Sequence, residues 1–227
     1  MREKNPLAWK ERASMTPADH FVLIVDDDIH VREALLDLLA ASDLQAVAFG
    51  SAAEYIAHPK PDVPACLILD VELPDINGLD LQQQMVEGDH PPIIFVTGHG
   101  DIPSSVRAIK AGALDFLTKP FSGPALLGLV HAALDQDRER RAKRAGRESL
   151  RRRYDSLTPR EREVLPLVVG GLLNKQAAAH LGISEITLQI HRTNVMRKMA
   201  AQSLADRVRM AGALEIPVTL ARRSYAA

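Results

Sequence analysis

Five short, continuous apolar runs constrain the fold of this chain more than any other feature of its sequence. Helical patterns separate the runs, which are Phe21–Val25, Ala46–Phe49, Cys66–Leu69, Ile93–Val96 and Phe116–Leu117. Strands that are apolar on both faces are typical of a parallel sheet covered by crossover helices on its two sides. The sequence therefore predicts an α/β doubly wound sheet of five parallel strands. Its helices are expected near His30–Ala41, Ser51–Ala57, Gly78–Glu87 and Pro103–Ala111.

After Gly123 the pattern becomes purely helical. A helix is expected to begin after Pro124 and to continue, as a solvated helix, through the Arg- and Lys-rich stretch Asp135–Arg153, with Gly146 as its weak point. Shorter helices are expected at Pro159–Gly170, Lys175–Leu181, Glu185–Met199 and Leu204–Gly212. A length of 227 residues fits two domains better than one. We expect an N-terminal extension (1–19), the α/β domain (20–132), a basic linker helix (133–154), an all-α four-helix domain (155–216) and a tail (217–227).

The formal net charge of −1 hides a strong asymmetry along the chain. Residues 21–130 carry 5 basic and 16 acidic side chains, a net charge of −11. Residues 131–153 carry 9 basic and 4 acidic side chains, and residues 154–227 carry 10 and 6, so both segments are positive. An acidic first half indicates a cation site, and a basic second half indicates a polyanionic partner.

The sequence gives no sign of export or of a membrane partner. Its apolar runs are far shorter than the ~18 residues that span a membrane, and the N-terminal residues lack the apolar stretch of a signal peptide. The single cysteine, Cys66, cannot form an internal disulfide and is expected to be buried within its apolar run. We therefore expect a cytoplasmic protein.

Carboxylates follow two of the predicted strands. Asp26 and Asp27 come directly after the first strand, and Asp70 comes directly after the third. Because the carboxyl ends of parallel strands meet at one edge of a sheet, these side chains should lie together and bind a hard cation such as Mg²⁺. Thr97 and Lys119 end the next two strands, where a hydroxyl and an ammonium could hold the oxygens of a phosphoryl group. Asp70 would then be the nucleophile, and Lys119-Pro120 is a candidate for a cis peptide bond.

Four motifs, each at the end of a predicted strand, resemble in sequence and in order those of a response-regulator receiver domain, and the resemblance covers roughly residues 20–132. They are Ile24–Asp28, Leu69–Gly78, Val96–Asp101 and Phe116–Phe121. The resemblance implies a flavodoxin-like fold in which Asp70 is the phospho-acceptor and a cognate histidine kinase is the donor. The implied Mg²⁺ ligands are Asp26, Asp27, Asp70 and the main-chain carbonyl of Glu72.

The resemblance also implies how phosphorylation would act. Thr97 would turn inward to bond the phosphate, and Phe116 would move into the vacated space, so that a local change of charge becomes a change of packing. A homodimer is expected to form on phosphorylation, through the fourth helix, fifth strand and fifth helix of the receiver. The chain would take phosphate onto its own aspartate, so we do not expect an enzyme with a separate substrate.

Two alternatives remain for the α/β domain. One is a regulator whose receiver no longer takes phosphate, although the complete set of acidic and switch residues argues against it. The other is a haloacid-dehalogenase-like phosphatase, in which Asp26-x-Asp28 would supply the nucleophile. Such enzymes have Thr or Val at the position that His30 occupies here. Asp28 is also explained as the N-cap of the helix near His30.

The second half carries the signals of a helix-turn-helix. Thr158, Pro159 and Glu161 fit an N-cap, the first helical position and a capping box. A short helix ending before Gly182 is followed by one that begins at Ser184. In a helix-turn-helix the second helix enters the major groove of DNA.

The helical spacing of this second helix separates its residues by role. Leu188, His191, Val195 and Met199 should face the core, so Gln189, Ile190, Thr193 and Arg197 should point outward. Gln189 suits an adenine edge and Ile190 suits a thymine methyl group. Arg192, Arg197 and Lys198 are candidates for phosphate contacts.

The segment from Leu157 to about Leu214 resembles the LuxR-type helix-turn-helix domain. The receiver sequence and the stretch Asn194–Met196 look most like the FixJ branch of FixJ/NarL-type regulators. The resemblance to the LuxR-type domain is carried by Leu157–Leu165, Asn174-Lys175, Thr187-Leu188 and His191. It implies a transcriptional regulator of double-stranded promoter DNA, with Lys175 and Thr187 among the contacts and RNA polymerase as a further partner. Ile186 departs from the family, which often has Arg or Lys there. The alternative is a small helical dimerisation module.

Overall fold

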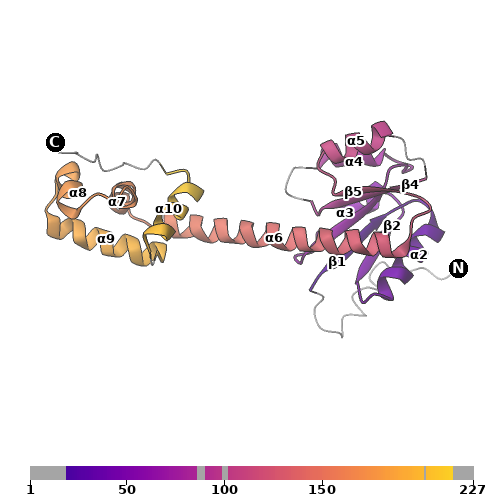
Figure 1. Cartoon of the computed structure of the whole chain (residues 1–227), viewed down its shortest axis with the longest axis horizontal. Coiled ribbons are helices and arrows are strands. Elements are labelled where there is room, and N and C mark those ends of the chain that lie inside the picture. Colours follow the sequence, from indigo (N-terminus) through magenta and orange to yellow (C-terminus); the bar gives the residue numbers. More distant parts are fainter. Residues whose placement is uncertain (1–18, 86–89, 99–101, 202, 217–227) are drawn as a thin grey trace. The chain divides into compact units, whose positions relative to one another are not determined.

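The structure is a computed structural model that describes residues 19–85, 90–98, 102–201 and 203–216 (Figure 1). Outside these ranges lie the expected N-terminal extension, except for Asp19, and the expected C-terminal tail. The expected helix end at Glu87 and the motif residues His99–Asp101 also lie outside them. The chain divides into two compact units, Met1–Arg141 and Ala142–Ala227.

The first unit is built on the predicted sheet of five parallel strands, in the order β2-β1-β3-β4-β5. The strands are β1 (Phe21–Val25), β2 (Ala46–Phe49), β3 (Ala65–Asp70), β4 (Ile93–Thr97) and β5 (Asp115–Thr118). Every residue of β3 and β4 is buried, which explains why both strands are continuously apolar up to their last residues, Asp70 and Thr97. The doubly wound fold is thus confirmed. The strand order places β1 beside β3, with Val25 paired to Leu69, so the carboxylates that follow these strands are neighbours.

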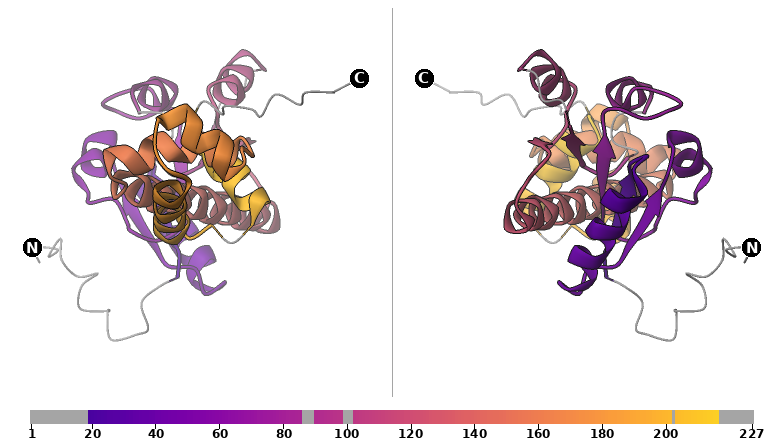
Figure 2. Two further views of the ribbon diagram at one scale, coloured as in Figure 1. Left: turned by 90° about the vertical axis from the view of Figure 1, so that its left-hand side faces the viewer. Right: turned by 90° about the vertical axis from the view of Figure 1, so that its right-hand side faces the viewer.

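Helices cover both faces of this sheet, as Figure 2 also shows. One face packs against α3 (Ala52–Ala57), α4 (Gly78–Gln84) and α5 (Ile102–Lys110), and the other packs against α2 (Ile29–Ala40) and the first part of α6 (Gly123–Asp155). Cys66 is buried on the second face, as predicted. The helix starts agree with the predicted ones to within about one residue; Ser51, for example, is the N-cap of α3 and not its first residue.

Helix α6 passes through Gly146 without a break. Its basic stretch is helical as predicted, but it is not solvated throughout, because Asp137 is fully buried. The Asp137 carboxylate accepts hydrogen bonds from the backbone N–H of Ala65 at 2.9 Å and from the Arg141 Nε at 2.7 Å. Contacts of the first unit therefore continue to Arg141, past the expected domain end at residue 132.

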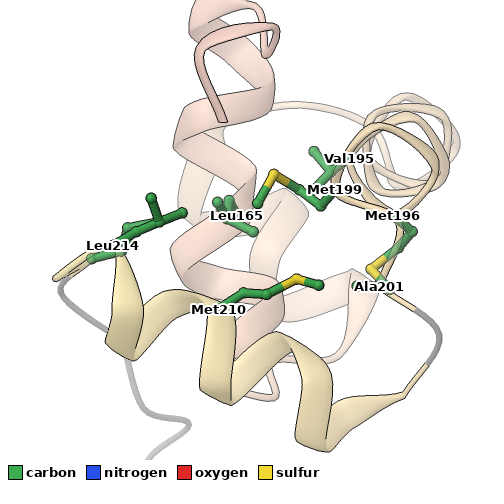
Figure 3. Close-up of a pocket in the computed structure, with 8 residues that line it drawn as sticks. Leu165, Val195, Met196, Met199, Ala201, Met210 and Leu214 are labelled. Atoms are coloured by element: carbon green, nitrogen blue, oxygen red, sulfur yellow. The ribbon is translucent and has the colours of Figure 1, made fainter. Parts of the chain in front are cut away.

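The second unit contains α7 (Pro159–Val169), α8 (Asn174–Leu181), α9 (Glu185–Met199) and α10 (Leu204–Ala213). The predicted capping box at the start of α7 is present, with Thr158 and Glu161 bonded to each other's backbone N–H groups. Leu188, Val195 and Met199 are buried as predicted, whereas His191 is only half-buried. Apolar side chains from the α7, α9 and α10 region, including Leu165 and Met210, enclose a cavity of about 10 Å³ (Figure 3). The cavity is a packing gap in the core.

Candidate functional site

Three carboxylates meet at the carboxyl edge of the sheet. Asp26 and Asp27 follow β1, and Asp70 is the last residue of β3. One carboxylate oxygen of each lies within 4.8 Å of the others. Asp26 and Asp70 are buried while Asp27 is exposed, so the cluster opens to solvent on the Asp27 side. Three carboxylates this close together, one of them exposed to solvent, fit Mg²⁺, which binds oxygen ligands and keeps several waters.

Lys119 joins the two buried carboxylates. Its ammonium donates hydrogen bonds of 2.6 Å to Asp26 Oδ2 and to Asp70 Oδ2. The lysine follows β5, and the Lys119-Pro120 peptide bond is cis. Three carboxylates and one ammonium leave two negative charges in this group of side chains, which is the charge that one divalent cation neutralises.

Burial and charge shift the pKa values of this cluster. Burial raises the pKa of Asp26, and the hydrogen bond from Lys119 offsets part of that effect. Burial alone would lower the pKa of Lys119, but its hydrogen bonds to Asp26 and Asp70 outweigh burial and hold the pKa above its ordinary value. Lys119 is therefore a cation at neutral pH, able to attract the oxygens of an anionic ligand.

Asp28 has a different role from the two carboxylates before it. Its side chain accepts a hydrogen bond of 2.8 Å from the backbone N–H of His30 and caps α2. Asp28 is outside the carboxylate cluster. The N-cap role weakens the phosphatase alternative, in which Asp28 would belong to the reacting pair.

The loop after Asp70 is held by contacts that the sequence did not reveal. Gly78 lies so close to the strand end that a Cβ would stand 2.2 Å from the main-chain oxygen of Asp70. Asp75 accepts hydrogen bonds from the backbone N–H groups of Ala52 and Ala53 at the start of α3. The D-x-N-G spacing of Asp75, Asn77 and Gly78 could have suggested a tight loop, but not which helix it would cap.

Arg32 is a second residue that sequence reasoning missed. Its guanidinium donates a hydrogen bond of 2.6 Å to the main-chain carbonyl of Asp26. The backbone N–H of Asp28 donates to the Asp26 carboxylate at 2.9 Å. Together these bonds fix the end of β1, and therefore the position of the Asp26 side chain.

The remaining residues predicted for the receiver site lie on β4, on β5 and just after β3. Thr97, fully buried, ends β4, and its carbonyl accepts a hydrogen bond of 2.7 Å from the Lys119 backbone N–H. Phe116 is half-buried on β5, with its ring 6.3 Å from that of Phe95. The backbone N–H of Glu72 donates to Asp70 Oδ1 at 3.0 Å. The switch roles of Thr97 and Phe116 and the ligand role of the Glu72 carbonyl stay predictions.

A second candidate site lies on the outer face of α9. The predicted outward residues are exposed, namely Gln189, Ile190, Thr193 and Arg197, and so are Lys175 and Thr187. Gly182, with φ of 64°, makes the turn between α8 and α9. Asn174, at the start of α8, donates to the Gln189 side-chain oxygen and accepts a 3.0 Å hydrogen bond from Arg192. The amide of Gln189 is thus partly occupied inside the protein.

The phosphate contact predicted for Lys198 stays a prediction, and in this structure its ammonium has partners inside the protein. Its ammonium forms a 2.6 Å ion pair with Glu161, whose side chain is buried, and donates to the Ser156 carbonyl at 3.1 Å. The helical spacing placed Lys198 near the edge of the outer face, but the buried carboxylate of Glu161 draws its side chain inward.

An acidic pocket at the carboxyl edge of a doubly wound sheet, in a chain that also carries a helix-turn-helix, defines a DNA-binding response regulator. Residues 22–131 match the family model of the response regulator receiver domain, and residues 155–211 match that of bacterial regulatory proteins of the luxR family. The chain belongs to the two-component response regulators of the FixJ/NarL type. No helix among the described residues is long and apolar enough to cross a membrane.

The chain is similar to several regulators of this type, and the similarity extends over most of the length of each. Nodulation protein W of Bradyrhizobium diazoefficiens is 48% identical over 211 residues, which cover 92% of this chain and 93% of that protein. Transcriptional regulatory protein FixJ of Azorhizobium caulinodans is 42% identical, covering 84% and 90%. The solved structure of the response regulator StyR matches with a TM-score of 0.78 and 43% identity, covering 86% of this chain and 99% of that one.

Proposed function

We propose that Asp70 accepts a phosphoryl group from a cognate histidine kinase in a Mg²⁺-dependent reaction, and that phosphorylation promotes dimerisation and binding to promoter DNA in the cytoplasm. The observation that carries the proposal is the bridging Lys119 ammonium, 2.6 Å from both Asp26 and Asp70. A nucleophilic carboxylate, a fixed cation and further carboxylates for a metal are the parts that phosphoryl transfer to an aspartate requires.

The proposed transfer assigns a task to each group. An Asp70 carboxylate oxygen forms a bond to phosphorus while the bond from phosphorus to the histidine nitrogen of the kinase breaks, and the electron pair leaves with the imidazole. Lys119 and the Thr97 hydroxyl would hold the phosphoryl oxygens, with Thr97 and Phe116 acting as the switch. Mg²⁺, held by Asp26, Asp27, Asp70 and the Glu72 carbonyl, would neutralise the negative charge that gathers there.

The proposed dimer surface includes α5. Three apolar side chains on this helix are exposed: Ile102 at 79%, Val106 at 45% and Ile109 at 46%. Exposed apolar side chains grouped on one short helix are typical of a surface that a partner covers. The support for this surface is the apolar patch together with the membership of the family.

The proposed DNA surface is the outer face of α9 with the start of α8. We assign DNA contacts to those predicted residues that are exposed and to Arg192, which is half-buried; Lys198 is left out. The assigned residues are Lys175, Thr187, Gln189, Ile190, Arg192, Thr193 and Arg197. RNA polymerase remains a proposed further partner of the DNA-bound protein.

Labelling with radioactive acetyl phosphate in the presence of Mg²⁺ tests the phosphorylation. The wild-type chain should take up label on Asp70, and Asp70→Asn should take up none. Asp28→Asn is the matched control, because it changes a neighbouring carboxylate that caps α2, and asparagine caps a helix equally well. Label mapped to Asp26 instead of Asp70 would favour the phosphatase alternative, and full labelling of Asp70→Asn would contradict the proposal.

A further inference from the structure

The outer face of α9 carries an apolar patch, formed by Ile186 and Ile190. Ile186 is 77% exposed and Ile190 is 57% exposed. In the described part of the second unit, the other large apolar side chain with comparable exposure is Leu173, just before α8. Because residues four apart are neighbours on a helix, the two isoleucines form one patch, on the side of α9 away from buried Leu188 and Val195.

The polar side chains beside the patch are engaged within the protein. The Gln189 amide oxygen accepts from Asn174, which also accepts from Arg192. The hydroxyl of Thr193 donates to the Gln189 carbonyl at 2.9 Å, which leaves its methyl group as the part without a hydrogen bond. The side-chain oxygen of Gln189 is therefore occupied inside the protein, whereas Ile186 and Ile190 are exposed to a partner that approaches α9.

Positive charge lies beside the patch, toward α8 and the carboxyl end of α9. Lys175 and Arg192 line an open groove of about 660 Å³ next to it, and Arg197 is exposed seven residues beyond Ile190. Glu185 also lines the groove, so the positive charge lies mainly toward α8 and the carboxyl end of α9. Cations beside an apolar patch suit a polyanion that displays apolar groups of its own, and the major groove of DNA displays the C5 methyl groups of thymine between two rows of phosphates.

We infer that Ile186 and Ile190 read thymine methyl groups in the major groove, and that this contact selects the sequence more strongly than the amide of Gln189. The inference rests on the proposed DNA-binding function. Four helical residues rise about 6 Å, and base pairs are about 3.4 Å apart. The two isoleucines should therefore read thymines within about two base pairs of each other in each half-site.

Replacing thymine by uracil in the binding site tests the inference, because uracil lacks only the methyl group. A site is first selected from random duplex DNA by the full chain treated with acetyl phosphate and Mg²⁺. Each thymine of that site is then replaced by uracil, singly, and affinity is measured by fluorescence anisotropy. For the wild-type chain, replacing a contacted thymine should weaken binding about three- to fivefold, which corresponds to one buried methyl group.

Variants connect this penalty to the two isoleucines. Ile186→Ala and Ile190→Ala should each remove the uracil penalty at one position per half-site, whereas Gln189→Ala should leave both penalties in place. Both isoleucines are exposed, so alanine should not disturb the fold. Ile56→Ala, the same change at a 65% exposed isoleucine on α3, is the matched control and should leave affinity and both penalties unchanged.

The outcomes separate this inference from the proposed function. An enriched site with no uracil penalty, or with penalties that persist in both isoleucine variants, would overturn the inference and leave DNA binding intact. A penalty lost in Gln189→Ala but kept in the isoleucine variants would also overturn it. If no site were enriched over random DNA, sequence-specific DNA binding would itself be contradicted and the inference would fall with it.

Discussion

Asp137 on α6 accepts a hydrogen bond of 2.9 Å from the backbone N–H of Ala65, the first residue of the strand that ends in Asp70. The Asp137 carboxylate is fully buried and also pairs with Arg141, which in turn donates to the Pro61 carbonyl at 3.0 Å. A residue beyond the matched receiver segment 22–131 thus binds the amino-terminal end of the strand that carries the proposed phospho-acceptor.

Replacing Asp137 should therefore destabilise the first unit. Asp137→Ala removes the acceptor of the Ala65 N–H and the partner of Arg141, and we expect a loss of about 2–4 kcal/mol in the free energy of unfolding. Asp135→Ala on the same helix is the control, since Asp135 is exposed and its pair with Arg138 should contribute less than about 1 kcal/mol. Urea unfolding followed by circular dichroism measures both. Equal effects would mean that the buried contact adds nothing.

Two glycine substitutions should change stability in opposite directions. Gly78→Ala places a Cβ 2.2 Å from the main-chain oxygen of Asp70, so the strand end must shift, and both stability and labelling by acetyl phosphate should fall. Gly146→Ala adds a methyl group in open space inside α6 and should stabilise the helix by about 0.5–1 kcal/mol. Thermal unfolding and labelling compare the two. A neutral Gly78→Ala would show that the loop adjusts easily.

The metal-binding prediction distinguishes two adjacent carboxylates. Asp27→Ala removes one of the three clustered ligands, so the affinity for Mg²⁺ should fall at least about tenfold. Asp28→Ala removes the N-cap of α2 and should lower stability by about 1 kcal/mol, with little effect on Mg²⁺. Calorimetric titration with Mg²⁺ measures the affinity. A larger loss for Asp28→Ala than for Asp27→Ala would reverse the assignment.

The acidic pocket was predictable because its residues follow strands directly. Continuous apolar runs located the strands, and a parallel sheet brings Asp26 and Asp70 to the same edge whatever the details of the loops. The contacts of Asp137 and Lys198 were not predictable. Helical spacing gives the face on which a side chain lies, but it does not show that Glu161, 37 residues before Lys198, presents a buried carboxylate.

The Glu161–Lys198 pair should make the stability of the second unit depend on pH. Burial raises the pKa of Glu161, but hydrogen bonds from Lys198 and from the Thr158 backbone outweigh it and hold the pKa below its ordinary value of 4.5. A carboxyl group whose pKa is lower in the folded than in the unfolded chain stabilises the folded state, and the stabilisation is complete above the unfolded pKa. It is lost as the pH falls through the folded pKa. The wild-type chain should therefore lose the stabilising contribution of Glu161 as the pH falls below about 4.5.

Glutamine at position 161 should flatten this dependence. Glu161→Gln leaves the Lys198 ammonium without its carboxylate and should cost about 1–3 kcal/mol at pH 7, with a smaller difference from wild type in acid. Glu163→Gln is the matched control, because Glu163 is exposed and pairs with Arg160 at the surface of the same helix. Urea unfolding of the three proteins between about pH 3 and pH 7 measures the difference. A constant difference between Glu161→Gln and wild type across this range would show that Glu161 titrates alike in the folded and unfolded chain.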